Sequence, residues 1–158
     1  MLKSEDDYDS YFEDTMKAGH YENNKKSVET MIRNSQKTIK RLISYGVDFE
    51  KNQDGSLKFT KEGAHSTPRI LFHQDITGKE ITSKLLAAVK KLSNVEMREM
   101  WEMTDIIEEN GGCTGIVAKD LSSGNEENIF AQDVIWATGG ISPNLPGQGL
   151  RKSLIFIL

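Results

Sequence analysis

The strongest constraint on the fold is an apolar run that leads into a glycine turn near the end of the chain. The run Val134–Ala137 has no polar face, which is typical of a strand in a sheet covered on both sides. Thr138, Gly139 and Gly140 follow directly, and such small residues let a backbone approach a ligand and turn its amides toward an anion. The segment predicts a buried strand that ends in a ligand-binding turn, although similar turns also occur without a ligand.

A second constraint is the absence of a glycine-rich phosphate loop. None of the 158 residues forms a strand followed by G-x-G-x-x-G, the pattern in which a turn and a helix N-terminus hold a pyrophosphate. The length is enough for one ordinary domain with a core of its own. A chain with a ligand-binding turn but no such fingerprint is expected to be the middle of a larger protein.

Composition argues against several functions. The formal net charge is −4 and no stripe of lysine and arginine is present, so a nucleic-acid partner is not expected. The single cysteine, Cys113, favours a reducing cytosol and is expected to be a packed, inert thiol. The three histidines lack metal-ligand spacing, so no metal site is expected. No signal peptide is predicted, and the apolar end Leu154–Leu158 is far shorter than the roughly 20 residues that span a bilayer.

Helical periodicity marks three segments. A short helix is expected to begin near Tyr8, and a longer one runs from Ser27 to Tyr45, where Gly46 supplies the stop. In the third, Thr77 and Glu80 have the spacing of a capping box. The apolar residues behind that box are expected to be buried: Ile81, Leu85, Leu86, Val89 and Leu92.

The remaining segments are predicted to be extended. Asn52–Gly55 is typical of a hairpin turn, and Leu57 and Phe59 alternate with polar residues as in a half-buried strand. A short strand is expected at Val95–Glu99, followed by an antiparallel meander with a turn at 122–125. The strands of the meander are expected at Met103–Glu108, Gly115–Asp120 and Asn128–Ala131. Together these elements predict an α+β fold.

Glu62 is the candidate binding residue of the segment Thr60–Ser66. Its small neighbours can bring a carboxylate close to a ligand, where it could pair with an ammonium group by a charge-assisted hydrogen bond. The alternative is a solvated loop glutamate. His65 and Arg69 could likewise be a structural hydrogen-bonding pair that anchors the loop.

From about Asp7 to Gly140 the chain resembles the L-aspartate oxidase family, within the succinate dehydrogenase and fumarate reductase flavoprotein superfamily. Glutamate at position 62 favours aspartate oxidase over the dicarboxylate-oxidising relatives, which usually lack that acid. The residues that carry the resemblance are Asp9-Ser10, Glu13-Asp14-Thr15, Ala18-Gly19, Ile43–Phe49, Lys61–Ser66, Arg69-Ile70-Leu71 and Thr77-Gly78.

The resemblance implies FAD as cofactor and oxidation of L-aspartate to iminoaspartate in NAD biosynthesis, with oxygen or fumarate reoxidising the flavin and quinolinate synthase taking the product. It implies that Glu62 lies near the substrate amino group and that the Met103 backbone runs close to the adenine. It further implies that Ala137, Thr138, Gly139 and Gly140 lie near FAD.

The departures from the family shape the remaining expectations. The fingerprint, the ribose-binding acid and the flavin loop of the family precede the first residue, and its catalytic arginine belongs to a region after Gly140, so no catalytic residue is assigned. Residues 1–140 are expected to be a partial, Rossmann-like FAD-binding domain, and residues 141–158 an atypical tail left by a truncation or frameshift. We expect the chain alone to bind no FAD and to self-associate. The alternatives are a non-catalytic folded fragment, or a fragment of a fumarate reductase or succinate dehydrogenase flavoprotein.

Overall fold

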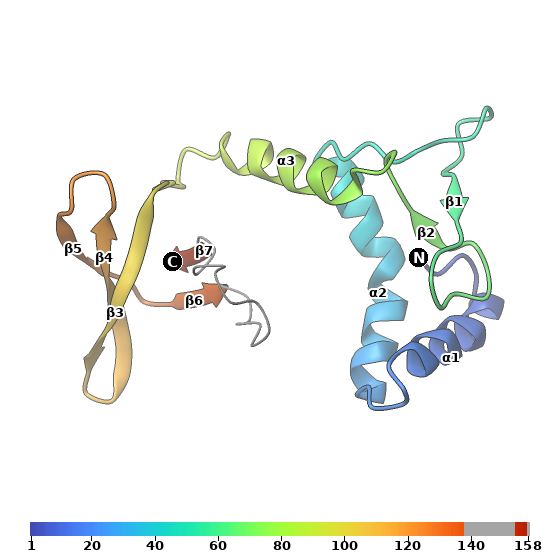
Figure 1. The fold of residues 1–158 in the computed structure, drawn as a ribbon, viewed down its shortest axis with the longest axis horizontal. Helices are drawn as coiled ribbons and strands as arrows, with labels where there is room; N and C mark the ends of the chain where they lie inside the picture. Colours follow the sequence, from blue (N-terminus) through green and yellow to red (C-terminus); the bar gives the residue numbers. More distant parts are fainter. Residues whose placement is uncertain (138–153, 158) are drawn as a thin grey trace, which may run out of the picture. The chain divides into compact units, whose positions relative to one another are not determined.

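The computed structural model describes residues 1–137 and 154–157, and it divides the chain into two compact units (Figure 1). The first unit is Met1–Val95 and the second is Glu96–Leu158. Helices belong to the first unit and most of the strands to the second, which confirms the α+β class. The predicted boundary at residue 140 lies outside the described residues.

The first unit is built on two helices that lie against each other. A short 3₁₀ helix, η1 (Glu5–Asp7), leads into α1 (Tyr8–Ala18), and α2 (Lys25–Ser44) follows after a short turn. The side chain of Asn24 caps α2 by accepting a hydrogen bond from the Ser27 amide at 3.0 Å. Gly46 ends it with φ at +92°, a conformation that only glycine adopts without strain. The predicted first and second helices are confirmed.

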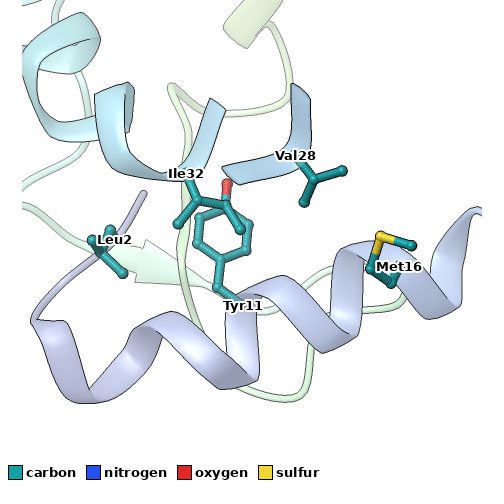
Figure 2. Packing of buried hydrophobic residues seen from close by; sticks show 5 residues of the cluster. All are labelled: Leu2, Tyr11, Met16, Val28 and Ile32. Carbon is teal, nitrogen blue, oxygen red and sulfur yellow. The ribbon is translucent and has the colours of Figure 1, made fainter. Parts of the chain in front are cut away.

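The α1–α2 contact buries one of two small hydrophobic cores (Figure 2). Tyr11 and Met16 of α1 meet Val28 and Ile32 of α2, and Ile32 is completely buried. Val28 and Ile32 lie four positions apart, as do Phe12 and Met16, so each helix turns one apolar face to the other. Full burial of a side chain such as Ile32 contributes about 1.5–3 kcal/mol.

The second core lies where the extended segment after α2 meets a small sheet. Val47, Phe49 and Leu71 are its buried residues. The sheet pairs β1 (Phe59–Thr60) with β2 (Ile70–Leu71) in antiparallel register. The predicted hairpin turn before β1 is confirmed, since Gly55 has φ at +83° and the Asn52 amide donates to the Ser56 carbonyl at 2.8 Å.

The third helix, α3 (Thr77–Val89), forms as predicted, but the predicted capping box is wrong. The Thr77 hydroxyl accepts a hydrogen bond from the His73 amide, and Glu80 accepts one from the Asp48 amide, both at 3.0 Å. Thr77 thus binds the loop before α3, and Glu80 binds the extended segment after α2, rather than the first turn of α3. The expected burial is also wrong: α3 has no buried residue, and Leu86 and Leu92 are exposed. Of the five residues expected to be buried here, only Ile81 packs against the second core.

The second unit contains the predicted meander of three antiparallel strands. Its strands are β3 (Trp101–Glu109), β4 (Gly112–Asp120) and β5 (Glu126–Phe130), in the order β3-β4-β5. β4 is central and supplies the buried residues Ile116 and Ala118. The Val95–Glu99 segment is not a strand, because the structure pairs it with no other described strand.

The strand β6 (Val134–Ala137) forms as predicted, but the prediction that it is buried is wrong. It pairs in antiparallel register with β7 (Leu154–Ile157) in a sheet of two strands. Ile135 is 46% exposed and Trp136 is 60% exposed. Nothing in the described part of the chain covers these side chains. Cys113, expected to be packed, is also exposed. None of the described helices is long and apolar enough to cross a membrane.

Candidate functional site around the loop 61–69

The loop that carries Glu62 runs from the end of β1 to the start of β2, residues 61–69. Its first half is a tight turn in which Gly63 has φ at +52° and the His65 amide donates to the Glu62 carbonyl at 3.2 Å. Its last residue, Arg69, is completely buried. The loop therefore has an exposed tip and a buried anchor.

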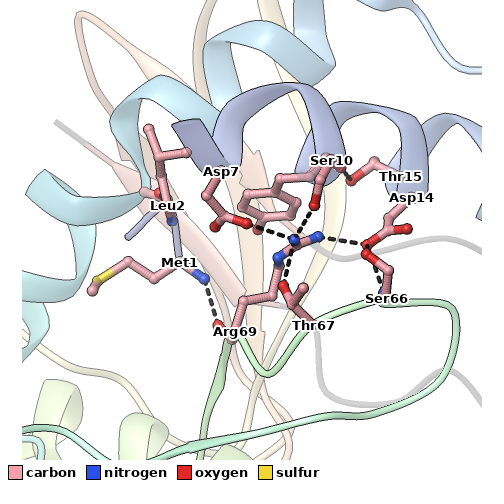
Figure 3. Close-up of polar contacts among 11 residues, drawn as sticks. Met1, Leu2, Asp7, Ser10, Asp14, Thr15, Ser66, Thr67 and Arg69 are labelled. Carbon is pink, nitrogen blue, oxygen red and sulfur yellow. Dashed lines mark hydrogen bonds and ion pairs between the residues drawn. The ribbon is translucent and has the colours of Figure 1, made fainter. Parts of the chain in front are cut away.

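The anchor is a cluster of polar side chains around the Arg69 guanidinium, which we call the Arg69 cluster: Asp7, Ser10, Asp14, Thr67 and Arg69 (Figure 3). Arg69 donates from Nη1 to Asp14 at 2.6 Å and from Nη2 to Asp7 at 2.8 Å. Nη2 also reaches the hydroxyls of Ser10 and Thr67, both at 2.7 Å. Two carboxylates and two hydroxyls compensate a charge that would otherwise be very costly to bury.

Asp14 binds the loop at a second point. Its Oδ2 atom accepts hydrogen bonds from the Ser66 amide at 2.7 Å and from the Ser66 hydroxyl at 2.8 Å. Burial by itself would raise the pKa of Asp14, but the hydrogen bonds from Ser66 and Arg69 outweigh it and hold that pKa below its usual value. Asp14 is thus an ionised acceptor for three donors of one loop.

His65 lies between the tip and the anchor. Its ring contacts the Tyr11 ring edge-on at 5.7 Å between centroids. Burial, followed by the nearby Arg69 charge, lowers the pKa of His65, so the neutral imidazole is favoured. Arg69 does anchor the loop as expected, but through α1: the expected pairing with His65 is wrong, because the guanidinium binds the aspartates and Nδ1 of His65 is buried without a hydrogen-bond partner.

Glu62 itself is exposed at the loop tip. No hydrogen bond or ion pair of its carboxylate is among the contacts of the described residues. Small neighbours surround it, as expected: Gly63 on the next position has open space where a side chain would be. The arrangement leaves a carboxylate available to a cation on a loop whose other end is held rigidly.

The residues expected to contact FAD belong to the second unit. Met103 is half-buried in β3, where it pairs with Ala118 beside an irregularity in the register. Ala137 is exposed and ends β6 opposite Leu154. Thr138, Gly139 and Gly140 lie outside the described residues. The contacts of all five with a cofactor therefore remain predictions.

The described residues do not form a complete dinucleotide site. A phosphate needs several converging amides or cations, whereas Met103 and Ala137 lie within paired strands. Among the described residues, the buried polar side-chain atoms that lack a partner belong to Asp7, Asn23, His65 and Arg69, all in the first unit. No group of three or more metal-ligating side chains occurs in the described ranges.

Sequence reasoning missed the Arg69 cluster as a unit. Its members lie up to 62 positions apart, so no local pattern joins them. The one available signal was an arginine directly before the apolar residues Ile70 and Leu71, since buried arginine demands carboxylate partners. Asp9, Glu13 and Asp14 are among the residues that carry the family resemblance, but the sequence assigned them no structural role.

The sequence of this chain is similar to known proteins over most of its length. A family model described as an FAD binding domain matches residues 1–154. The L-aspartate oxidase of Clostridium perfringens is 44% identical over 141 residues, covering 89% of this chain and 31% of that protein. The L-aspartate oxidase of Clostridium acetobutylicum is 40% identical over 131 residues, covering 83% of this chain and 30% of that protein. The chain thus spans about a third of the length of these relatives.

Solved structures agree on the fold. Sdh1 of Mycobacterium smegmatis, in complex with UQ1, matches with a TM-score of 0.78 and 26% identity, over 83% of this chain and 24% of that one. FrdA of Escherichia coli quinol fumarate reductase matches with a TM-score of 0.82 and 23% identity, over 89% of this chain and 24% of that one. At 23% identity the second match shows the fold alone. Since the family model spans almost all of its length, this chain belongs to the FAD binding domain family.

Proposed function

We propose that the chain is part of an FAD-dependent L-aspartate oxidase, in which Glu62 binds the substrate ammonium group. Its 44% identity to an L-aspartate oxidase supports the substrate. The single observation that carries the role of Glu62 is its position: an exposed carboxylate at the tip of a loop whose base is tied to α1 by the Arg69 cluster.

The role of this chain in the reaction is binding and orientation. Oxidation of L-aspartate to iminoaspartate removes two electrons and two protons. In a complete protein, FAD would be the electron acceptor. Glu62 would pair with the ammonium group and so distinguish aspartate from succinate, which has the same carboxylates without the amine. No catalytic residue is proposed among the described residues.

The test is an assay of a complete protein that carries this segment. With FAD present, it should convert L-aspartate to iminoaspartate with oxygen or fumarate as acceptor. Succinate oxidation that exceeds aspartate oxidation would instead assign the segment to a dicarboxylate-oxidising flavoprotein.

The proposed compartment is the cytosol, in keeping with a single, unpaired cysteine.

We predict that the 158-residue chain purifies without colour. FAD affinity in related folds depends on a pyrophosphate held at a glycine-rich helix N-terminus, and the sequence contains no such fingerprint. A short glycine turn offers too few amides to offset the cost of ordering a large dinucleotide. A visible absorbance spectrum and titration calorimetry with FAD check this. Stoichiometric yellow protein or sub-micromolar binding would contradict it.

We also predict that the chain self-associates. In the described part of the chain the sheet β6–β7 has two strands, and Ile135 and Trp136 on it are exposed. Open strand edges with apolar side chains recruit other chains. Light scattering should show a mass that rises with concentration. Replacing Trp136 with lysine should lower that mass, whereas Asn128→Lys, an exposed polar position on the edge strand β5, adds the same charge without removing an apolar side chain and serves as the control. A monomer at high concentration would rule the prediction out.

A further inference from the structure

We propose that Asp14 is a positioning residue that holds the loop 61–69 in the shape that presents Glu62. The inference rests on the proposed function for the role of Glu62, but the loop-holding role of Asp14 stands on contacts alone. Nothing in the local sequence of α1 points to the loop, which begins more than 40 positions later.

The carboxylate of Asp14 joins the middle of the loop to its base. Its Oδ2 atom accepts from the Ser66 amide, the Ser66 hydroxyl and Arg69, at 2.7, 2.8 and 2.6 Å. Ser66 directly follows the turn in which the His65 amide binds the Glu62 carbonyl. Holding Ser66 in place therefore fixes the end of the turn that carries Glu62.

The contacts also distinguish a role of Asp14 in positioning the loop from a role in stabilising the fold. Arg69 keeps Asp7, Ser10 and Thr67 as partners when Asp14 is neutralised. Among the described residues, the amide and the hydroxyl of Ser66 have one hydrogen-bond partner, Asp14. Loss of the Asp14 charge should therefore loosen the loop while the buried guanidinium stays compensated on the other side. The low pKa of Asp14 agrees with a carboxylate that is ionised in its working state.

The first test measures amide hydrogen exchange in the 158-residue chain. Asp14→Asn keeps the shape of the side chain but removes its charge, and Asp9→Asn is the matched control, an exposed acid on the same helix. We expect the two hydrogen-bonded amides of the loop, those of His65 and Ser66, to exchange about tenfold faster in Asp14→Asn, as the loss of one charge-assisted hydrogen bond implies, with α2 unchanged. Equal exchange of these amides in the two variants overturns the proposal.

A milder variant covers the case in which Asp14→Asn unfolds the unit and α2 also exchanges faster. Ser66→Ala removes only the hydroxyl donor. The hydrogen bond from the amide of residue 66 to Asp14 stays, and so does every contact of Arg69. It should speed exchange of the His65 and Ser66 amides by a few-fold without any change in α2. No change in the loop would again contradict the proposal.

The second test asks whether Asp14 acts through Glu62. In a complete protein carrying this segment, Asp14→Asn should lower kcat/KM for aspartate while fumarate reduction is little changed, and Asp14→Glu should restore part of the loss. In a Glu62→Gln background the same Asp14→Asn change should have no further effect on aspartate. Additive effects overturn the positioning role. If Glu62→Gln alone changes nothing, the proposed role of Glu62 fails, while the exchange experiment still decides whether Asp14 holds the loop.

Discussion

Replacing Arg69 with methionine is expected to destabilise the Met1–Val95 unit by about 3–5 kcal/mol, enough to unfold a marginal unit. The guanidinium is completely buried, and its removal leaves the Asp7 and Asp14 carboxylates facing each other with little access to water. The loop 61–69 would lose its anchor at the same time. Urea unfolding followed by circular dichroism measures the change.

The matched control for this variant is Arg33→Met on α2. Arg33 is half exposed and pairs with Glu29 at 3.0 Å one helical turn away, so its loss should cost much less stability than the loss of Arg69. A triple variant, with Asp7 and Asp14 changed to asparagine beside Arg69→Met, should recover part of the stability because no buried charge is left unpaired. Equal destabilisation by Arg69→Met and Arg33→Met would show that the Arg69 cluster is not the anchor.

The pH dependence of stability should follow from the same cluster. The pKa of Asp14 is lower in the folded chain than in the unfolded one, so its contribution is complete above the unfolded value and is lost as the pH falls through the folded value. His65 acts in the same direction at higher pH, because its lowered pKa favours the neutral ring in the folded state. Acid therefore removes both contributions, that of His65 first.

Elements set by local pattern could be predicted from the sequence. The periodicity of Ser27–Tyr45 and the stop at Gly46 gave α2 to within two residues, because a helix depends on near neighbours. The meander was found but its first hairpin turn was not singled out, although Asn110-Gly111 with positive φ at both positions is a strong signal. Gly115 shows a further limit: a Cβ there would lie 2.3 Å from the Ile129 carbonyl, a contact visible only once the strands pair.

Features set by distant partners could not be predicted. Thr77 and Glu80 have the spacing of a capping box, but the amides of His73 and Asp48 compete for their oxygens. The apolar pattern of Val134–Ala137 predicts burial only if something covers the strand, and the described residues provide β7 at one edge and nothing over Trp136. The Arg69 cluster joins α1 to a loop more than 50 residues away, beyond any local signal.

Replacing Glu62 with glutamine in a complete protein is expected to lower its preference for aspartate by about 10- to 150-fold. Glutamine keeps the shape and hydrogen bonding of glutamate but removes the charge. Aspartate would lose an ion pair to its ammonium group, whereas succinate and fumarate have no amine to lose. A desolvated, charge-assisted hydrogen bond is worth roughly 1.5–3 kcal/mol, which gives that range of specificity.

The measurement is kcat/KM for aspartate oxidation and for fumarate reduction in the same variant. The fall should be confined to aspartate, because a carboxylate that binds an ammonium group acts only on the substrate that carries one. Lys61→Gln is the neighbouring control, an exposed charge on the same loop that should change neither value by more than a few-fold. If both values for Glu62→Gln fall equally, or neither moves, then Glu62 is a solvated loop acid and the discrimination between aspartate and succinate lies elsewhere in the protein.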